Sequence, residues 1–213
     1  MMVDGVDIPC TDGVMIADTV QIGTGTTILP GTILLGNTTI GKDCLIGPNT
    51  YIMDGTVGNG VTLDNVKLTD STVEDGADAG PFVQIRGGSV LHTGVHIGDF
   101  VEVKNSTVGA GTKSAHLTYI GDSDVGAGVN FGCGTVTVNY DGKNKSRCKI
   151  GDGAFIGCNT NLVAPVEVGD RAYIAAGSTI TDDIPGDALS IARARQVNKP
   201  GWVTEKKPYK EKK

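Results

Sequence analysis

The feature that most constrains the fold is a repeat of about six residues that runs through most of the chain. The first run of aliphatic residues at this spacing is Ile16, Ile22, Ile28, Leu34, Ile40, Ile46 and Ile52. The series resumes from Ile85 to Phe131 and from Ile156 to Ile180. This period fits no α-helix, whereas it is typical of a parallel β-helix in which each repeat supplies one strand and one corner. The sequence therefore predicts an all-β solenoid whose triangular coils contain about eighteen residues each.

The composition agrees with a solenoid of tight turns. Glycine occurs 32 times and aromatic residues make up only 5% of the chain, which suits many corners and a core of small aliphatic side chains. The net charge of −6 favours neither a nucleic acid nor a membrane as partner. The five cysteines lack CxxC spacing, which argues against a disulfide framework or a zinc site. With no signal peptide or membrane span in the sequence, we expect a cytoplasmic protein.

One polar insertion interrupts the repeat. Between Thr137 and Ile150 the chain reads VNYDGKNKSRCK, with Asp-Gly turn chemistry and several cations. A polar loop in an otherwise regular solenoid is a place where function is often found, although it can also be a tolerated surface loop. We expect a single domain over residues 1–213, with coils over about 14–184, this loop over 138–149 and a C-terminal arm over 185–213.

Stacking the predicted coils places residues in columns about one strand spacing, ~4.8 Å, apart. Arg86 and Lys104 share one column, and two stacked cations either hold an anion such as phosphate between them or splay into water. Glu102 and Tyr119 share another column, and Glu102 is expected near His116, where its carboxylate would orient the ring. An exposed glutamate at a corner is the simpler alternative.

A third column begins with a titratable side chain and continues with small ones. Its members are His116, Cys133, Cys158 and Ala176. An extended thin ligand such as the pantetheine arm of coenzyme A could lie along it, with its reactive end at the histidine. A surface histidine above ordinary small β-helix residues would give the same pattern.

Two segments, KSAHLTYIGD at 113–122 and VNYDGKNK at 138–145, carry a resemblance to a known family. From about residue 13 to residue 202 the chain resembles the acetyltransferase domain of the bacterial bifunctional enzyme that makes UDP-N-acetylglucosamine. The resemblance implies a left-handed β-helix that acts as a glucosamine-1-phosphate N-acetyltransferase in the synthesis of this cell-wall precursor. It also implies acetyl-CoA as co-substrate, no metal, and a homotrimer with active sites at the subunit interfaces. The family's Gly-rich LxAGxGTRM-type nucleotide loop has no match here, so we expect no transfer of UMP.

The same resemblance implies roles for single residues. His116 matches the general base, with Glu102 as its expected partner. The positions that match sugar-phosphate ligands are Arg86, Lys104, Tyr119, Asn130 and Lys145. The positions that match acetyl-CoA contacts are Cys133, Asn139, Tyr140, Cys158, Ala176 and Arg193. The family usually has Ala at 133 and Ser at 158, so the two cysteines remove a hydroxyl at 158 but leave the space.

Other functions share this architecture. A hexapeptide carbonic anhydrase would bind zinc through three histidines, but His92, His96 and His116 fall at different offsets and are not expected to converge. A non-enzymatic or ice-binding β-helix would present a flat, repetitive threonine face, which the charged cluster from Arg86 to Lys145 is not. A related acyltransferase could act on another amine or on a sugar nucleotide, and only the resemblance of the insertion argues against it.

Overall fold

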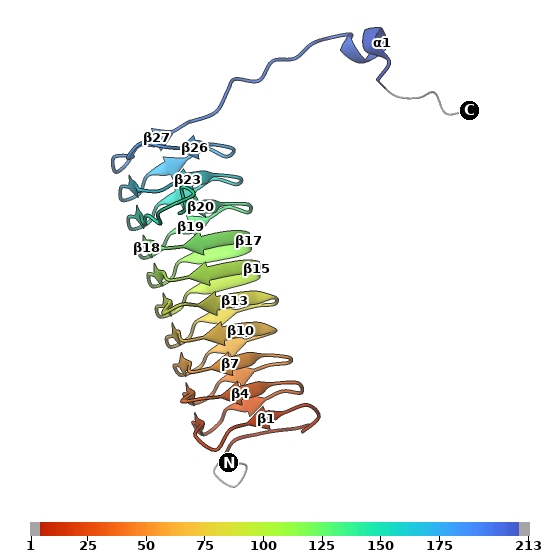
Figure 1. Cartoon of the computed structure of the whole chain (residues 1–213), viewed down its shortest axis with the longest axis vertical. Helices are drawn as coiled ribbons and strands as arrows, with labels where there is room; N and C mark the ends of the chain where they lie inside the picture. The colour runs from red at the N-terminus through yellow and green to blue at the C-terminus, as the bar shows by residue number, and fades with distance from the viewer. Residues whose placement is uncertain (1–4, 209–213) are drawn as a thin grey trace, which may run out of the picture.

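The computed structural model describes residues 5–208, which form a left-handed parallel β-helix followed by an extended arm (Figure 1). Each coil contributes short strands to the three faces of a prism, and strands at the same place in successive coils pair in parallel. The all-β solenoid predicted from the six-residue period is therefore confirmed, and so is the left-handed β-helix that the resemblance implied.

The three faces have the following strands. Face A contains β1 (Met15–Ile16), β4 (Ile33–Leu35), β7 (Tyr51–Met53), β10 (Val66–Thr69), β13 (Val83–Arg86), the second half of β15 (His96–Lys104), the second half of β17 (Lys113–Gly121), β20 (Val136–Val138), β23 (Asn161–Val163) and β26 (Thr179–Ile180). Face B contains β2 (Gln21–Ile22), β5 (Thr39–Ile40), β8 (Thr56–Val57), β11 (Thr72–Val73), β14 (Val90–Leu91), β16 (Thr107–Val108), β18 (Ser123–Val125), β21 (Cys148–Ile150) and β24 (Val166–Val168). Face C contains β3 (Thr27–Ile28), β6 (Leu45–Ile46), β9 (Thr62–Leu63), β12 (Asp78–Ala79), the first halves of β15 and β17, β19 (Asn130–Phe131), β22 (Phe155–Ile156), β25 (Tyr173–Ile174) and β27 (Leu189–Ser190).

The core is a narrow column of aliphatic side chains along the prism. The largest fully buried ones are Ile28, Leu34, Ile46, Ile52, Leu63, Leu68, Ile85, Leu91, Ile97, Ile120, Ile156 and Leu162. Full burial of one such side chain stabilises the fold by about 1.5–3 kcal/mol. The strand registers confirm the predicted columns, since Ile85 lies opposite Val103 on face A and Leu91 opposite Val108 on face B.

The corner between faces C and A is unusual in two coils. Here β15 and β17 run through the corner as strands of 9 residues each. Phe100 and Leu117 take left-handed backbone conformations at this corner, with φ of 58° and 32°, a region that large side chains rarely occupy. Such strain is often concentrated at functional sites. The same corner carries Asp99 and His116, which lie opposite each other in the strand register.

The polar insertion leaves the prism after β20 and rejoins it at β21. Its base is closed by a hydrogen bond of 2.9 Å from the Ser146 N–H to the Asn139 carbonyl oxygen. Within it, Tyr140 and Lys145 form an antiparallel bridge. The Asp141 carboxylate accepts hydrogen bonds from two backbone N–H groups of the turn between them. The insertion therefore has a defined shape close to the prism.

The coils extend further along the chain than predicted. β27 pairs with β25, and the Thr179 N–H donates to the Ala192 carbonyl oxygen at 3.0 Å. The arm predicted over 185–213 therefore begins only after Ala192, because the preceding residues still complete the hydrogen bonds of the last coil. Residues 1–4 and 209–213 of the predicted domain lie outside the described part.

The arm leaves the end of the prism and runs away from it (Figure 1). Residues 193–208 are exposed along their whole length and include the short helix α1 (Trp202–Lys206). Within residues 5–208, no helix is long and apolar enough to cross a membrane.

Candidate active site

The corner histidine is held by a carboxylate from the neighbouring coil. His116 Nδ1 lies 2.8 Å from Asp99 Oδ1. This hydrogen bond lowers the pKa of the Asp99 carboxyl below its ordinary value. In the neutral ring an Nδ1–H that donates to a carboxylate leaves the lone pair on Nε2. Because 62% of the His116 side chain is exposed, this nitrogen can accept a proton from a bound molecule.

The expected partnership of Glu102 with His116 is wrong. Glu102 Oε1 instead accepts hydrogen bonds from Arg86, at 2.8 Å from Nε and 2.7 Å from a terminal guanidinium nitrogen. The strand register explains the difference, because Glu102 lies opposite Tyr119 on face A, whereas Asp99 lies opposite His116 at the corner. The sequence contained the signal for Asp99, which sits two places after Ile97 in the column that His116 occupies.

The two stacked cations lie as predicted but are not left without charge partners. Arg86 is opposite Lys104 in neighbouring coils. Arg86 pairs with Glu102, and Lys104 Nζ lies 3.1 Å from Asp122 Oδ2. Their mutual repulsion is therefore relieved within the chain, and no bound anion is needed for that purpose. Each cation still has N–H groups beyond those directed to its carboxylate.

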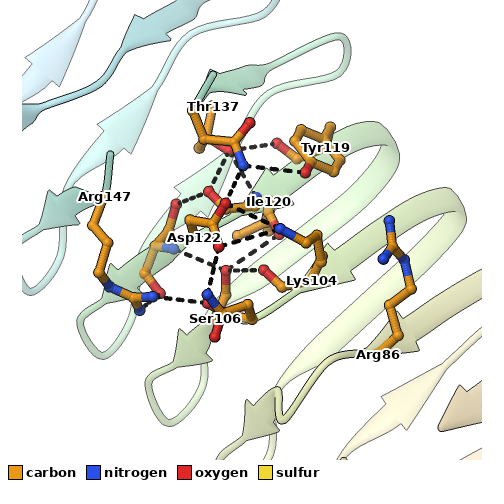
Figure 2. Close-up of polar contacts among 12 residues, drawn as sticks. Arg86, Lys104, Ser106, Tyr119, Ile120, Asp122, Thr137 and Arg147 are labelled. Atoms are coloured by element: carbon orange, nitrogen blue, oxygen red, sulfur yellow. Dashed lines mark hydrogen bonds and ion pairs between the residues drawn. The ribbon is translucent and has the colours of Figure 1, made fainter. Parts of the chain in front are cut away.

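Asp122 is buried and is the centre of a polar network that the sequence did not indicate (Figure 2). Its carboxylate accepts hydrogen bonds from Lys104, from Asn105 Nδ2 at 2.5 Å and from Asn139 Nδ2. Burial alone would raise the pKa of the Asp122 carboxyl, but these donors hold it below its ordinary value. Burial is the largest single influence on Lys104 and disfavours its charge, yet hydrogen bonding and the negative charge of Asp122 together outweigh it and raise the pKa of Lys104.

The remaining predicted sugar-phosphate residues are only partly brought together. Tyr119 lies beside Asn139, a residue predicted to contact acetyl-CoA. Asn139 is buried, and its Nδ2 is 3.4 Å from the Tyr119 hydroxyl. Lys145 is exposed on the insertion. Asn130 lies on the outer side of face C, between Lys113 and Phe155 in the register. We call Arg86, Glu102, Lys104, Tyr119, Asp122 and Asn139 the face-A cluster.

The predicted column of small residues is present and open to solvent. The registers that join Ser114, Phe131, Ile156 and Ile174 place His116, Cys133, Cys158 and Ala176 one above another. All four are exposed. We call these four residues the corner strip. Arg193 lies near the end of the strip, because its Cδ is 3.6 Å from the position that a Cβ on Gly177 would occupy. Tyr140 lies on the insertion, where it is 56% exposed.

The other histidines do not converge on His116. His92 Nδ1 lies 3.0 Å from Glu74, and His96 Nδ1 lies 2.5 Å from Asp78. Each of the three rings thus has a different carboxylate. Among the described residues, no group of three histidine, cysteine or carboxylate side chains is arranged to hold a metal ion. The zinc site of a carbonic anhydrase is therefore not formed within this part of one subunit.

Two family models match segments of the chain. Residues 147–182 match the bacterial transferase hexapeptide (six repeats), and residues 37–65 match the hexapeptide repeat of succinyl-transferase. A solved UDP-N-acetylglucosamine acyltransferase from Francisella novicida superposes with a TM-score of 0.56 at 17% identity, covering 87% of this chain and 66% of that one. That similarity supports the fold.

Curated relatives are much more similar in sequence. The bifunctional protein GlmU of Geobacillus sp. (strain WCH70) is 56% identical over 202 residues, which make up 95% of this chain and 44% of that protein. The bifunctional protein GlmU of Halalkalibacterium halodurans is 56% identical over 185 residues, covering 87% of this chain and 41% of that protein. The chain thus spans less than half the length of these relatives.

Proposed function

This chain is a hexapeptide-repeat protein that matches the C-terminal part of the bifunctional GlmU proteins, and from that membership we propose that it is an acetyl-CoA-dependent N-acetyltransferase. Its acceptor is glucosamine 1-phosphate, and its product, N-acetylglucosamine 1-phosphate, serves the synthesis of UDP-N-acetylglucosamine. The observation that carries the proposal is the His116–Asp99 pair, which lies at the first residue of the corner strip, at the corner that leads into face A.

In this reaction His116 acts as the general base. The amine of the sugar attacks the thioester carbon, and His116 Nε2 takes a proton from the nitrogen as the new C–N bond forms. The C–S bond then breaks, and the CoA sulfur leaves as a thiolate that is protonated to the thiol. General-base assistance of this kind is worth roughly 10² to 10⁴ in rate. Asp99 keeps the ring in the tautomer and orientation that the step requires.

The face-A cluster holds the phosphate end of the acceptor. Arg86 and Lys104 each keep donors that are not used by their carboxylates, and charge-assisted hydrogen bonds to phosphate are the strong ones. Tyr119 and Lys145 contribute at the same side, and Asn130 contacts the sugar from face C.

The corner strip takes the pantetheine arm of acetyl-CoA. Cys133, Cys158 and Ala176 are small and exposed, so they leave room for a thin ligand along about three strand spacings, ~14 Å. In this proposal Arg193, which lies near Gly177 at the end of the strip, and Asn139 and Tyr140 of the insertion complete the acetyl-CoA site. The transfer itself needs no metal, because the thioester is already activated and the base is a side chain.

The working enzyme is a cytoplasmic homotrimer with its sites between subunits. The candidate residues lie on the outside of a convex prism, and small-molecule sites are concave, so a second copy must supply the other wall. The exposed side chains of Phe82, Phe100 and Leu117 beside His116 give such a copy an apolar surface to cover. The arm is long and exposed. A segment that contacts a neighbouring subunit in a trimer would have this form when one chain is considered alone.

The proposal is tested by following CoA release from acetyl-CoA with a panel of amines. We expect turnover with glucosamine 1-phosphate and much slower turnover with glucosamine, serine or amino-sugar nucleotides. His116→Ala in the same assay controls for a contaminating transferase. Faster turnover with an acceptor that lacks a phosphate would assign the chain to another acyltransferase of this fold.

A further inference from the structure

Asp122 sits at a corner where short polar residues with left-handed backbone recur. Asp54, Asp70 and Asn105 occupy this corner in earlier coils with φ of 52°, 46° and 47°, and Asp122 has φ of 48°. Aspartate and asparagine tolerate this conformation better than most residues do. The turn therefore explains why a short polar residue stands at position 122, but it does not explain the surroundings of the carboxylate.

Those surroundings set Asp122 apart from its equivalents. Asp70 is exposed, whereas the side chain of Asp122 is only 5% exposed. A buried carboxylate is costly unless donors satisfy it, and here Lys104, Asn105 and Asn139 do so. The donors come from the coil before and from the start of the insertion, as Figure 2 shows for Lys104. The Asp122 carboxylate thus connects Lys104, a cation of the prism, to the base of the insertion.

We propose that Asp122 is a positioning residue for the phosphate end of a phosphorylated amino sugar, a role that rests on the proposed function. Asp122 fixes the Lys104 ammonium at the end of its flexible stem, in the place where it meets the phosphate. The same carboxylate fixes Asn139, and through it the point at which the insertion leaves the prism. Asp122 itself touches no substrate.

The physical benefit is preorganisation. A lysine has a long flexible stem and three N–H donors. Contacts with Asp122 immobilise the Lys104 ammonium before any ligand arrives and leave at least one donor free, so less freedom is lost on binding. Because Lys104 and Asp122 together are neutral, the site depends on the direction of the remaining N–H groups more than on net charge.

The test is Asp122→Asn, which keeps the shape and the tolerance for the left-handed turn but removes the charge. We expect kcat/KM for glucosamine 1-phosphate to fall about tenfold or more, the size of a lost charge-assisted contact. With glucosamine as acceptor the fall should stay within about threefold, and the KM for acetyl-CoA should change less than about twofold. If Asp122 only stabilised the fold, its substitution would reduce kcat/KM by the same factor with glucosamine 1-phosphate and with glucosamine.

Two further variants keep the result interpretable. Asp70→Asn makes the same change at the same corner in an exposed place and should leave every parameter unchanged. The double variant Lys104→Met with Asp122→Asn removes both charges and leaves no unpaired buried charge. It can therefore fold even if Asp122→Asn alone does not. If Asp122 acts through Lys104, the double variant should be no worse than Lys104→Met alone, rather than showing the product of the two losses.

Binding of inorganic phosphate, measured by calorimetry, separates this inference from the proposed function. Wild type should bind phosphate, and both Lys104→Met and Asp122→Asn should weaken that binding about tenfold. Normal acetyl transfer together with unchanged phosphate binding in Asp122→Asn would overturn the positioning role and leave the function standing. Phosphate binding that depends on Asp122 in a chain that does not acetylate glucosamine 1-phosphate would support the positioning role and refute the acceptor. Absence of both activities in wild type would overturn both.

Discussion

At the scale of single residues, the proposed chemistry depends on His116. Replacing His116 with alanine should lower kcat by roughly 10² to 10⁴, the worth of a general base. The melting temperature should hardly change, because the side chain is 62% exposed and packs against little. Steady-state kinetics and a thermal melt on the same preparation check both statements. A kcat within about threefold of wild type would exclude His116 as the base.

Substitutions of Asp99 and of Glu102 should change different kinetic parameters, since the two carboxylates have different partners in the structure. Asp99→Asn should lower kcat at saturating substrates, because the ring of His116 loses its orientation. Glu102→Gln should act mainly on the KM for the sugar phosphate, because it frees Arg86. The opposite assignment of effects would restore Glu102 as the partner of the base.

The sign of the pH dependence follows from the Asp99 carboxyl, whose pKa lies below its ordinary value because His116 donates to it. Because the pKa is lowered, the carboxylate stays charged and bound to its partner at any pH above the ordinary carboxyl pKa of about 4. The contact is lost only when the pH falls further. The Asp99–His116 contact is therefore intact over the neutral range, and Asp99→Asn should reduce kcat there.

The stacked cations give a prediction about substrate choice. Arg86→Ala and Lys104→Ala should each weaken use of glucosamine 1-phosphate by about 1.5–3 kcal/mol in kcat/KM, as for charge-assisted contacts. Use of plain glucosamine should change much less. Comparison of kcat/KM for the two acceptors tests this, and equal losses with both would show that the pair does not contact a phosphate.

At the scale of elements, the corner strip can be mapped through its thiols. Cys133 and Cys158 are exposed on the strip, Cys10 is half-buried in the first coil, and Cys44 and Cys148 are buried in the core. Burial raises the pKa of Cys148 to about 11, and the thiolate is the reactive form. At pH about 8 an alkylating reagent should therefore modify Cys133 and Cys158 rapidly and Cys148 very slowly.

Bound CoA turns this reactivity into a test of the strip. Mass spectrometry of alkylated peptides should show protection of Cys133 and Cys158 by CoA, and unchanged labelling of Cys10, which serves as the internal control. Protection of neither strip thiol would move the CoA site elsewhere on the prism. Equal slowing of all thiols would instead indicate a general change in the fold.

At the scale of the whole molecule, a site shared between subunits should show complementation. His116→Ala and Arg193→Ala are each expected to be nearly inactive, one through the prism and one through the arm. If the two residues serve one site from different subunits, mixed trimers formed by subunit exchange should regain part of the activity. Light scattering of wild type should give the mass of a trimer. A fully active monomer at assay concentration would refute the shared site.

The sequence alone determined the fold and the columns in which most of the candidate residues stand. Inward residues must be aliphatic about once in six positions, so the period of the chain is also the period of the prism. Strand pairing then follows by arithmetic, and the columns of Arg86 with Lys104 and of His116 with Cys133 could be written down in advance. Asp99 was readable by the same arithmetic, because it stands one coil before His116 at the same offset.

The tertiary structure decided what the side chains do with their neighbours. Glu102 and Asp99 are three residues apart, and only the tertiary structure shows that the Glu102 carboxylate is directed to Arg86 and not to His116. In the sequence Asp122 is one of several polar corner residues, and only the tertiary structure brings Lys104 and Asn139 into hydrogen bonds with its carboxylate. A repeat specifies backbone position, because every coil obeys the same geometry. The partner of each side chain depends on which long polar groups are buried together. The three-dimensional packing of neighbouring coils determines these groups.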